Sequence, residues 1–195
     1  MAEKLSDRIR LPFRFDPHLL SHDLQGLTAS NWIKHFVRQN YEGDWSVIPL
    51  RGKAGATHPV MMIYSDPTAT QFEDTPTLKA CPYFQTVLAT FKCPLQATRL
   101  MRLTPGSVIK EHTDHELSVD EGTARIHVPI VTNPDVEFYL NGKRVVLEAG
   151  SVWYLRLSDP HRVHNKGAAD RVHLVIDATV NSWLKELLAA ASEFA

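Results

Sequence analysis

Three pairs of polar residues in the second half of the chain combine side chains that bind metals and carboxylates. The pairs are His112 with Asp114, Arg125 with His127, and Arg171 with His173. Members of each pair are two positions apart, and side chains with this spacing on a β-strand point to the same face. They could be solvent-facing positions of a half-exposed sheet. That kind of face usually carries Lys, Glu, Thr and Ser, so these residue types favour a site that holds a metal and an acid.

A metal bound by His112 and Asp114 needs a further protein ligand. Two histidines and one carboxylate form the facial triad of non-heme Fe(II) oxygenases, which leaves coordination positions open for small molecules. His161 and His164 are the candidates for the second histidine, and both follow a predicted strand. Spacing alone does not decide between them.

The elements that would position these residues are short strands with turn signals about every 8–12 residues. This spacing is typical of a β-sandwich or β-barrel. We predict strands at 98–103, 107–111, 124–131, 136–140, 143–147, 151–157 and 171–178. Asn141-Gly142 predicts a tight hairpin, because both residues tolerate positive φ. Asn141 and Gly142 thus separate two of these strands, and Asn181 would cap a C-terminal helix at 181–195. The fold class is therefore mainly β, a jelly roll whose mouth commonly holds a small ligand.

Residues 1–96 show mixed signals, and we predict helices and strands that flank the jelly-roll core at 97–180. Asp16 followed by Pro17 is typical of a helix start, and the apolar spacing at 32–37 and 83–91 predicts two further helices. Residues 45–50 and 60–64 are interpreted as strands. The loops 51–59 and 65–76 are expected to form the substrate wall, where Arg51 and Lys53 could meet a substrate carboxylate. All 195 residues are expected to form a single domain.

Composition limits the classes of function. Lys plus Arg number 21 and Asp plus Glu number 22, which gives a formal net charge of −1 and argues against a nucleic-acid binder. No apolar run approaches the roughly 18 residues of a membrane helix, and the polar N-terminus does not resemble a signal peptide. The two cysteines are far apart and predict reduced thiols. We therefore expect a cytoplasmic protein that acts without nucleic acid or membrane.

Five motifs in order make the chain similar to a known family. They are 105–107 (Pro-Gly-Ser) leading to 112–114 (His-Thr-Asp), 125–129 (Arg-Ile-His-Val-Pro), 149–154 (Ala-Gly-Ser-Val-Trp-Tyr), 160–163 (Pro-His-Arg-Val) and 171–177 (Arg-Val-His-Leu-Val-Ile-Asp). Over about residues 97–184 the chain resembles the aspartyl/asparaginyl β-hydroxylases, which are Fe(II)- and 2-oxoglutarate-dependent dioxygenases on a double-stranded β-helix. The resemblance implies that fold, Fe(II) and 2-oxoglutarate for this chain.

The resemblance also implies residue roles. His112, Asp114 and His161 would bind the metal, since His161 has the offset of the family's distal histidine and His164 lies beyond it. Arg171 resembles the anchor for the far carboxylate of 2-oxoglutarate, a role that suits a guanidinium fork. Arg125 and His127 match positions at the metal-side end of the cosubstrate.

Two departures from the family pattern affect these expectations. The family's serine that assists the arginine anchor has no match, because Met101 falls near that place, and Arg99 or Arg102 would have to compensate. The vertebrate peptide hydroxylases of the family lack the carboxylate ligand, whereas this chain has Asp114, as the family's bacterial amino-acid hydroxylases do.

The activity implied is hydroxylation of an unactivated carbon, at Cβ by resemblance, with molecular oxygen as co-reactant. The substrate would be an Asp- or Asn-like amino acid, either free, carrier-bound or in a peptide. The alternative from the residues alone is a cupin-like module that binds a metal or a small acid without oxidising anything. Arg171 distinguishes the two hypotheses, because a plain metal-binding cupin does not need it.

Overall fold

The computed structural model describes residues 5–66, 68–115 and 117–192. Its strands are β1 (Arg8–Arg14), β2 (Ile33–Lys34), β3 (Tyr41–Glu42), β4 (Trp45–Lys53), β5 (Phe72–Asp74), β6 (Leu95–Leu103), β7 (Val108–His112), β8 (Thr123–Val131), β9 (Val136–Leu140), β10 (Lys143–Val145), β11 (Ser151–Leu155), β12 (His161–Asn165) and β13 (Arg171–Thr179). Its α-helices are α1 (Pro17–Gln25), α2 (Pro59–Ile63), α3 (Pro76–Lys79), α4 (Pro82–Ala89) and α5 (Ser182–Ser192).

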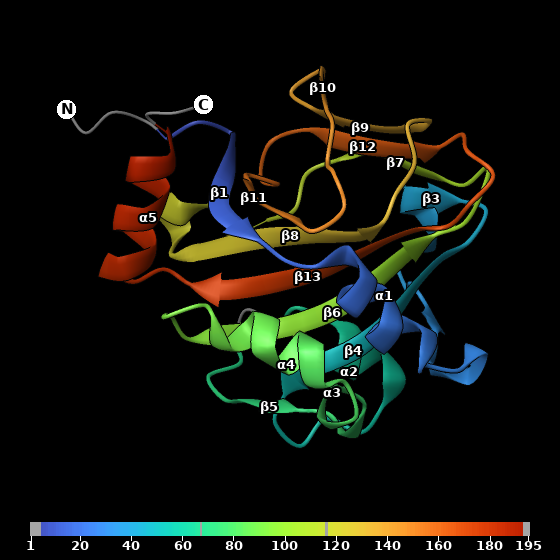
Figure 1. Cartoon of the computed structure of the whole chain (residues 1–195), viewed down its shortest axis with the longest axis horizontal. Coiled ribbons are helices and arrows are strands. Elements are labelled where there is room, and N and C mark those ends of the chain that lie inside the picture. The colour runs from blue at the N-terminus through green and yellow to red at the C-terminus, as the bar shows by residue number, and fades with distance from the viewer. Residues whose placement is uncertain (1–4, 67, 116, 193–195) are drawn as a thin grey trace.

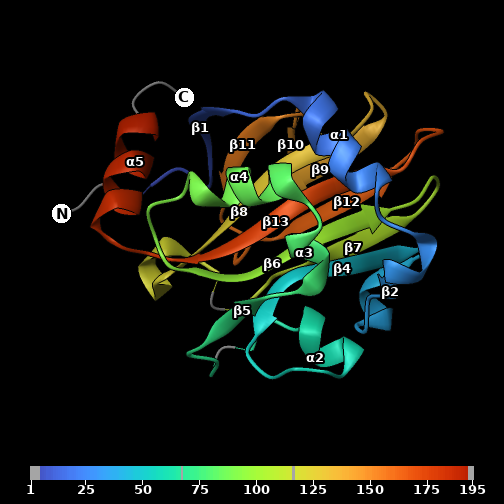
Figure 2. The ribbon, with the colours of Figure 1, turned by 60° about the horizontal axis from the view of Figure 1, so that its bottom comes forward.

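Two antiparallel sheets form the body of the molecule (Figure 1). The larger has the order β1-β11-β8-β13-β6-β4-β2 with β5 beside β4, and the smaller has the order β10-β9-β12-β7-β3. In Figure 1 the smaller sheet lies above the larger one, and Figure 2 shows α2 and β5 beside β4 at the lower end. The prediction of a mainly β, double-stranded β-helix fold is confirmed.

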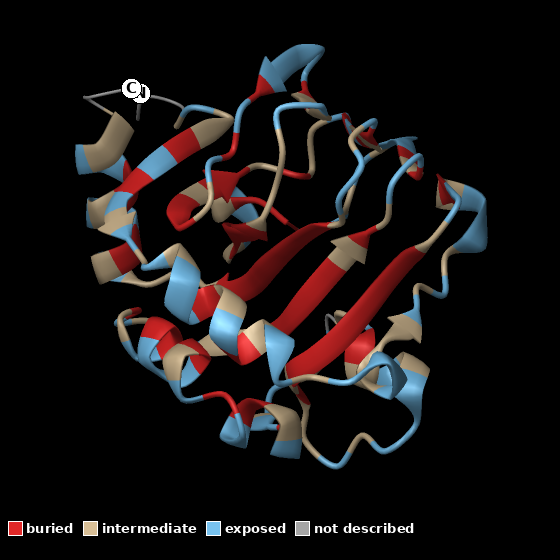
Figure 3. Ribbon diagram, turned by 45° about the vertical axis from the view of Figure 1, so that its right-hand side comes forward, coloured by how far each residue is buried: buried red, intermediate tan, exposed pale blue. Residues whose placement is uncertain are grey.

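Each face of the larger sheet contributes to a different hydrophobic core. Its outer face packs against α1, α3, α4 and α5, with Leu100, Ile126 and Leu174 among the fully buried residues. Its inner face packs against the smaller sheet, where Leu103 and Val175 meet Phe138. Because both faces are covered, β8 and β13 are buried over nearly their whole length. Figure 3 shows the long strands at the centre of the molecule largely in red, the colour of buried residues.

The alternation of side chains along these strands places polar groups between the sheets. Arg125 and His127 of β8, with Arg171 and His173 of β13, share the inner face and are all buried. The aliphatic residues between them, such as Ile126, lie in the outer core, as the period of two predicts.

Local signals in the sequence located several elements correctly. Asp16 caps α1, where its carboxylate accepts a hydrogen bond from the backbone N–H of His18 at 2.8 Å. Asn141 and Gly142 have φ of 51° and 69° and form the predicted hairpin turn between β9 and β10. Asn181 accepts from the N–H of Leu184 at 3.0 Å at the start of α5, and residues 193–195 of the predicted helix lie outside the described part.

Three predictions of secondary structure are wrong. Residues 60–64, expected as a strand, belong mainly to α2, which begins at Pro59 with the His58 ring accepting from the Val60 N–H. Residues 32–37, expected as a helix, instead contain β2, because Ile33 pairs with Val47 at the edge of β4. The loop predicted at 65–76 contains β5, which also pairs with β4.

The first 96 residues contribute strands to both sheets, since β1 and β4 join the larger one and β3 joins the smaller one. The division into a flanking region, a core at 97–180 and a C-terminal helix within a single domain stays a prediction. Among the described residues, none of the helices combines the length and apolar character needed to cross a bilayer.

Candidate metal centre and adjoining cavity

The structure brings His112, Asp114 and His161 together at one end of the space between the sheets. One ligand atom from each residue lies within 4.8 Å of the others. His161 opens β12 directly opposite His112, the last residue of β7, so strand pairing fixes the two imidazoles side by side. Asp114 lies in the loop after β7 rather than on the strand. Its backbone N–H donates a hydrogen bond to the carbonyl oxygen of Leu157 at 2.8 Å.

The strand register separates the two candidate histidines. Along β12, His161 and Val163 are buried, whereas His164 is half-buried and lies on the opposite face. His164 opposes Val108 and is not among the residues that line the cavity. The geometry therefore groups His161, and not His164, with His112 and Asp114.

The hydrogen bonds of the two histidines leave the Nε2 atoms ready to accept a metal. Nδ1 of His112 lies 2.8 Å from the carbonyl oxygen of Lys110, and Nδ1 of His161 lies 3.0 Å from that of Asp159. A carbonyl only accepts, so each Nδ1 must donate, and each Nε2 is then the bare nitrogen in the neutral ring. This assignment of protons follows from the hydrogen-bond pattern.

Charges around Asp114 keep it ionised. Burial alone would raise the pKa of Asp114, but the neighbouring His112 ring and the Arg125 guanidinium at 2.7 Å hold that pKa well below its usual range. Burial lowers the pKa of His161 to about 4, which favours the neutral ring that a metal requires. The carboxylate and this imidazole are therefore in the protonation states of metal ligands.

A network of buried charges extends from Asp114 across the larger sheet. Asp177 of β13 accepts from Arg125 through both carboxylate oxygens, at 2.7 and 3.0 Å, and from Arg99 at 3.1 Å. Ser65 donates to Asp177 at 3.0 Å and also contacts Arg99. Burial would raise the pKa of Asp177, but the two arginines lower it to about 2.

Sequence reasoning assigned no role to Asp177, although a signal was present. It lies in the apolar end of β13 and shares strand parity with Arg171 and His173. Of the two arginines expected to compensate for Met101, Arg99 lines the cavity, whereas Arg102 bonds Ser46 at 3.1 Å and covers the ring of Trp32.

Arg171 also lines the cavity and has no carboxylate partner among the described residues. It is 2% exposed, and its Nη2 donates to Nδ1 of His173 at 2.8 Å, while its Nε has no hydrogen-bond partner in that part of the chain. Burial lowers the pKa of Arg171 to about 9. A buried, unpaired cation is costly, so the position fits an anionic group supplied from outside the chain.

A cavity of about 850 Å³ joins these groups. Its lining includes the His112, Asp114 and His161 cluster together with Arg99, Arg125, His127, Arg171 and Asp177. Its other wall is aromatic. There the ring of His35 stacks on Trp45 at 3.6 Å between centroids, and Phe36 meets Tyr64 edge-on at 5.8 Å.

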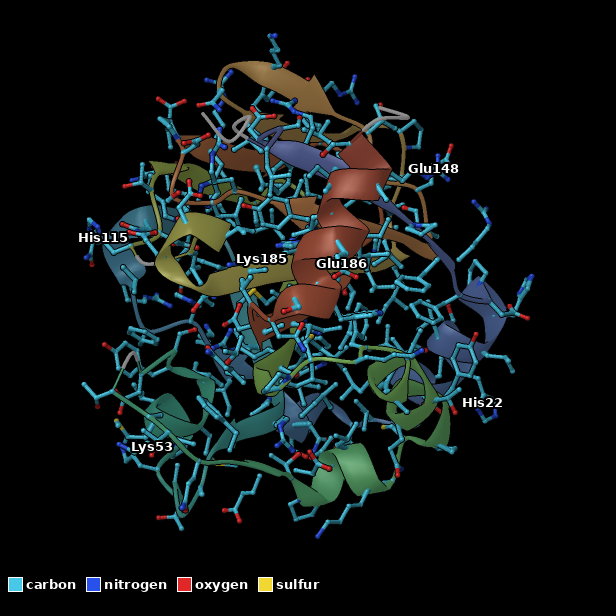
Figure 4. All side chains as sticks on the ribbon, turned by 90° about the vertical axis from the view of Figure 1, so that its left-hand side faces the viewer. His22, Lys53, His115, Glu148, Lys185 and Glu186 are labelled. Atoms are coloured by element: carbon cyan, nitrogen blue, oxygen red, sulfur yellow. The ribbon has the colours of Figure 1, made fainter. Side chains whose placement is uncertain are left out.

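The predicted roles of the first-half loops are partly altered by the structure. The loop 65–76 does reach the cavity, through Ser65 and Phe72 among others. Arg51 and Lys53 do not line it, because they pair with Asp74 and Asp66 respectively. Figure 4 places Lys53 at the periphery of the molecule.

The whole arrangement can be compared with known proteins. A family model described as aspartyl/asparaginyl beta-hydroxylase matches residues 18–180. The chain belongs to this family. Among curated proteins it is similar to an L-proline cis-4-hydroxylase of Rhizobium meliloti (strain 1021), with 25% identity over 177 residues. That match covers 90% of this chain but 61% of the relative, so the chain spans less than two thirds of the relative's length.

Solved structures support the fold of this hydroxylase-family chain. A Pseudomonas putida prolyl-4-hydroxylase superposes with a TM-score of 0.56 at 12% identity, covering 90% of this chain and 94% of its own. A 2OG-Fe(II) oxygenase family oxidoreductase from Burkholderia pseudomallei gives a TM-score of 0.55 at 16% identity, covering 90% and 86% respectively. At these identities the similarity establishes the shared double-stranded β-helix.

Proposed function

We propose that this chain is an Fe(II)- and 2-oxoglutarate-dependent dioxygenase that hydroxylates an unactivated carbon of an amino acid. The observation that carries the proposal is a single cavity lined by two different kinds of group. One is the cluster of His112, Asp114 and His161, and the other is the guanidinium of Arg171, which has no carboxylate partner among the described residues. A site for a metal alone has no use for a buried cation in the same cavity.

The three clustered residues would bind the iron. Two imidazoles and a carboxylate suit Fe(II) and leave open positions for other ligands. Arg125 would act on the metal indirectly, because its guanidinium holds the Asp114 carboxylate in place at 2.7 Å and is itself held by Asp177.

Arg171 would pair with the far carboxylate of 2-oxoglutarate, and Arg125 and His127 would face its metal-side end. The chemistry that iron and cosubstrate supply together is oxidative: one atom of O₂ enters the substrate, the other enters succinate, and CO₂ is released. The protein's own part is to orient the reactants and exclude water. The buried residues of the inner core around Phe138 and Val175 provide that dry surrounding.

For the substrate, we favour a free amino acid with an apolar portion. Arg99 supports this view because its Nε lacks a partner among the described residues while its side chain lines the cavity, as a partner for a substrate carboxylate would. The aromatic wall of Phe36, Tyr64 and Trp45 would pack against apolar carbon. The name of the curated relative, a proline hydroxylase, points the same way. Carrier-bound and peptide substrates remain alternatives for the test.

The metal and cosubstrate are tested by anaerobic titration of the protein with Fe(II) and then with 2-oxoglutarate. The proposal expects a weak visible charge-transfer band that needs both additions and is lost in Arg171→Met. A cupin-like binding module would take up metal without developing the band. Fe(II) binding with no response to 2-oxoglutarate would therefore overturn the dioxygenase proposal.

The substrate is tested by screening under air for succinate release coupled to a mass increase of one oxygen atom. Free proline, other apolar amino acids, their N-acylated forms and short peptides make up the panel. A free apolar amino acid should give both signals. Coupled turnover only with peptides or acylated forms would contradict the preference for a free substrate.

A further inference from the structure

Three buried side chains form a chain of hydrogen bonds along the inner face of the larger sheet. Nη2 of Arg171 lies 2.8 Å from Nδ1 of His173, and this same nitrogen lies 3.2 Å from Nδ1 of His127. The three residues are 2%, 1% and 4% exposed. His173 therefore links the residue expected at the far end of the cosubstrate to one expected at its metal end.

The contacts determine where the protons of the two histidines lie. A guanidinium only donates, so Nδ1 of His173 must be a bare acceptor, and the neutral ring carries its proton on Nε2. Nδ1 of His127 then has to donate to it, because two bare nitrogens at 3.2 Å would repel. His127 is left with a bare Nε2, and this assignment again rests on the hydrogen-bond pattern.

The environment keeps this arrangement fixed. Burial, together with the charge of Arg171, lowers the pKa of His173 well below its ordinary value, so its ring stays neutral. Burial and the charge of Arg171 also lower the pKa of His127. The Nη2 of Arg171 donates to His173, whereas the Nε of Arg171 has no hydrogen-bond partner among the described residues.

We propose that His173 is a positioning residue for a 2-oxo dicarboxylate: it orients the guanidinium of Arg171 toward the far carboxylate and fixes the tautomer of His127. This inference rests on the proposed function, and it assigns a role to a histidine that the metal and cosubstrate contacts do not require. A structural histidine that only fills space would give neither effect.

The test compares the affinity of two oxo acids in the presence of Mn(II), which replaces Fe(II) so that no turnover occurs. 2-Oxoglutarate carries the far carboxylate, and 2-oxobutyrate keeps the oxo-acid end but lacks it. His173→Leu removes the acceptor, and His173→Gln moves the polar group away from the Nδ1 position. His173→Asn keeps an oxygen near that position. His22→Leu on the exposed face of α1 is the control, and Figure 4 shows His22 at the surface.

The Leu and Gln variants should raise the Kd of 2-oxoglutarate about tenfold, the scale of one hydrogen bond to a charged group. The Kd of 2-oxobutyrate should change by less than about threefold, because the effect acts through Arg171. The Asn variant should stay within about threefold of the wild type for both ligands. Having two acceptor-removing variants keeps the test decisive if His173→Leu does not fold.

A second readout needs neither metal nor cosubstrate. Nitrogen and carbon NMR of the histidine rings should find His127 as the Nδ1–H tautomer in the wild type and released to Nε2–H in His173→Gln. Unchanged or tighter 2-oxoglutarate binding in the acceptor-removing variants, or equal loss for both oxo acids, would overturn the role of His173 alone. If the wild type binds neither oxo acid, the proposed function fails, and the cosubstrate role of His173 fails with it.

Discussion

At the scale of the residue, Arg171 shows how function can act against stability. The side chain is buried without a counter-charge from the described residues, so the metal-free and cosubstrate-free protein bears its desolvation cost. Replacing a buried charge with an apolar side chain of similar volume is often neutral or stabilising. Strain of this kind is commonly retained where a ligand relieves it.

We predict that Arg171→Met raises the free energy of unfolding of the metal-free protein by about 1–3 kcal/mol. The same variant should lose measurable 2-oxoglutarate binding. Urea denaturation checks the first effect, and calorimetric titration in the presence of Mn(II) checks the second. Arg162→Met on the exposed face of β12 is the matched control and should change neither quantity much. A destabilised Arg171→Met protein would show that the guanidinium is satisfied within the fold.

Asp114 is the proposed ligand that would distinguish this chain from the two-histidine branch of the family. We predict that Asp114→Ala weakens Mn(II) binding by more than about 100-fold, since even a residue that only supports a ligand contributes about 10–100-fold. The loss has a second cause, because the charge of Arg125 at 2.7 Å from this carboxylate would then face the metal. Glu186→Ala on α5, at the surface in Figure 4, is the control. Retained affinity would place the chain with the two-histidine enzymes.

Much of the candidate site was predictable from the sequence because strand parity is local information. A spacing of two correctly placed Arg125 with His127 and Arg171 with His173 on one face. The partners of Asp177 were not predictable in this way. Arg99 lies 78 positions away and Ser65 lies 112 positions away, so the contacts depend on strand pairing and loop placement that periodicity does not encode.

At the scale of the element, Asp177 connects β13 to β8 and β6 through two buried arginines. Removing one partner of a buried ion pair usually costs about 3–5 kcal/mol, because the remaining charge stays buried. We therefore predict that Asp177→Asn lowers the free energy of unfolding by about 3 kcal/mol at neutral pH. It should also weaken Mn(II) binding, since Arg125 would hold Asp114 less firmly.

The pKa of Asp177 predicts how the stability that this residue contributes changes with pH. Asp177 has a pKa of about 2 in the folded protein against an ordinary value of 3.8. Its contribution is fully present above 3.8 and is lost as the pH falls through about 2. The gap between wild type and Asp177→Asn in urea denaturation should thus narrow by about 2 kcal/mol as the pH falls through this range. A gap that does not change with pH would mean that the carboxylate's charge contributes little.

Two turn glycines with similar positive φ separate the cost of backbone strain from the cost of a steric clash. Gly142 and Gly150 have φ of 69° and 76°. A Cβ on Gly142 would meet nothing within 4 Å, whereas one on Gly150 would lie 2.2 Å from the carbonyl oxygen of Phe15. We predict that Gly142→Ala costs about 1 kcal/mol and that Gly150→Ala costs about 3 kcal/mol or more, as measured by thermal and urea unfolding. Equal costs would show that the backbone at Phe15, just after β1, shifts easily away from this turn.

The elements that the sequence misassigned are short and lie where tertiary contacts decide. Residues 60–64 are an apolar run too short for periodicity to separate a strand from a helix. Pro59 at the first helical position, after the capping ring of His58, was the available signal. Ile33 joins β2 because the edge of β4 offers it a partner, which overrides helical spacing.

At the scale of the whole molecule, the site lies between the sheets that form the inner core. β8 and β13 supply Arg125, His127, Arg171 and Asp177, and the same strands contribute apolar residues to the outer core. The sequence predicted this sandwich from its second half. It did not predict that β1 and β4 would join the larger sheet from the first half, because β1 pairs with β11 and β4 pairs with β6, and both partners are distant in the sequence.

This position couples ligand binding to global stability, because the site exists only when the strands are paired. A ligand that binds only the folded state at 100 times its Kd adds about 2.7 kcal/mol, which for a chain of this size corresponds to roughly 5–10 °C in Tm. We predict that Mn(II) alone raises Tm and that 2-oxoglutarate alone does so weakly. The two together should exceed the sum of the separate shifts, because His112, Asp114, His161 and Arg171 line one cavity, where a dicarboxylate would contact the metal and the guanidinium at once.

Differential scanning calorimetry of the wild type and Arg171→Met measures this coupling. In Arg171→Met the metal should still raise Tm, since His112, Asp114 and His161 are untouched, whereas the added effect of 2-oxoglutarate should disappear. An equal cosubstrate shift with and without metal would mean that the carboxylate binds at Arg171 independently of the metal end. The increase in Tm beyond the sum of the two separate shifts thus measures how strongly the binding of metal and the binding of 2-oxoglutarate support each other in this cavity.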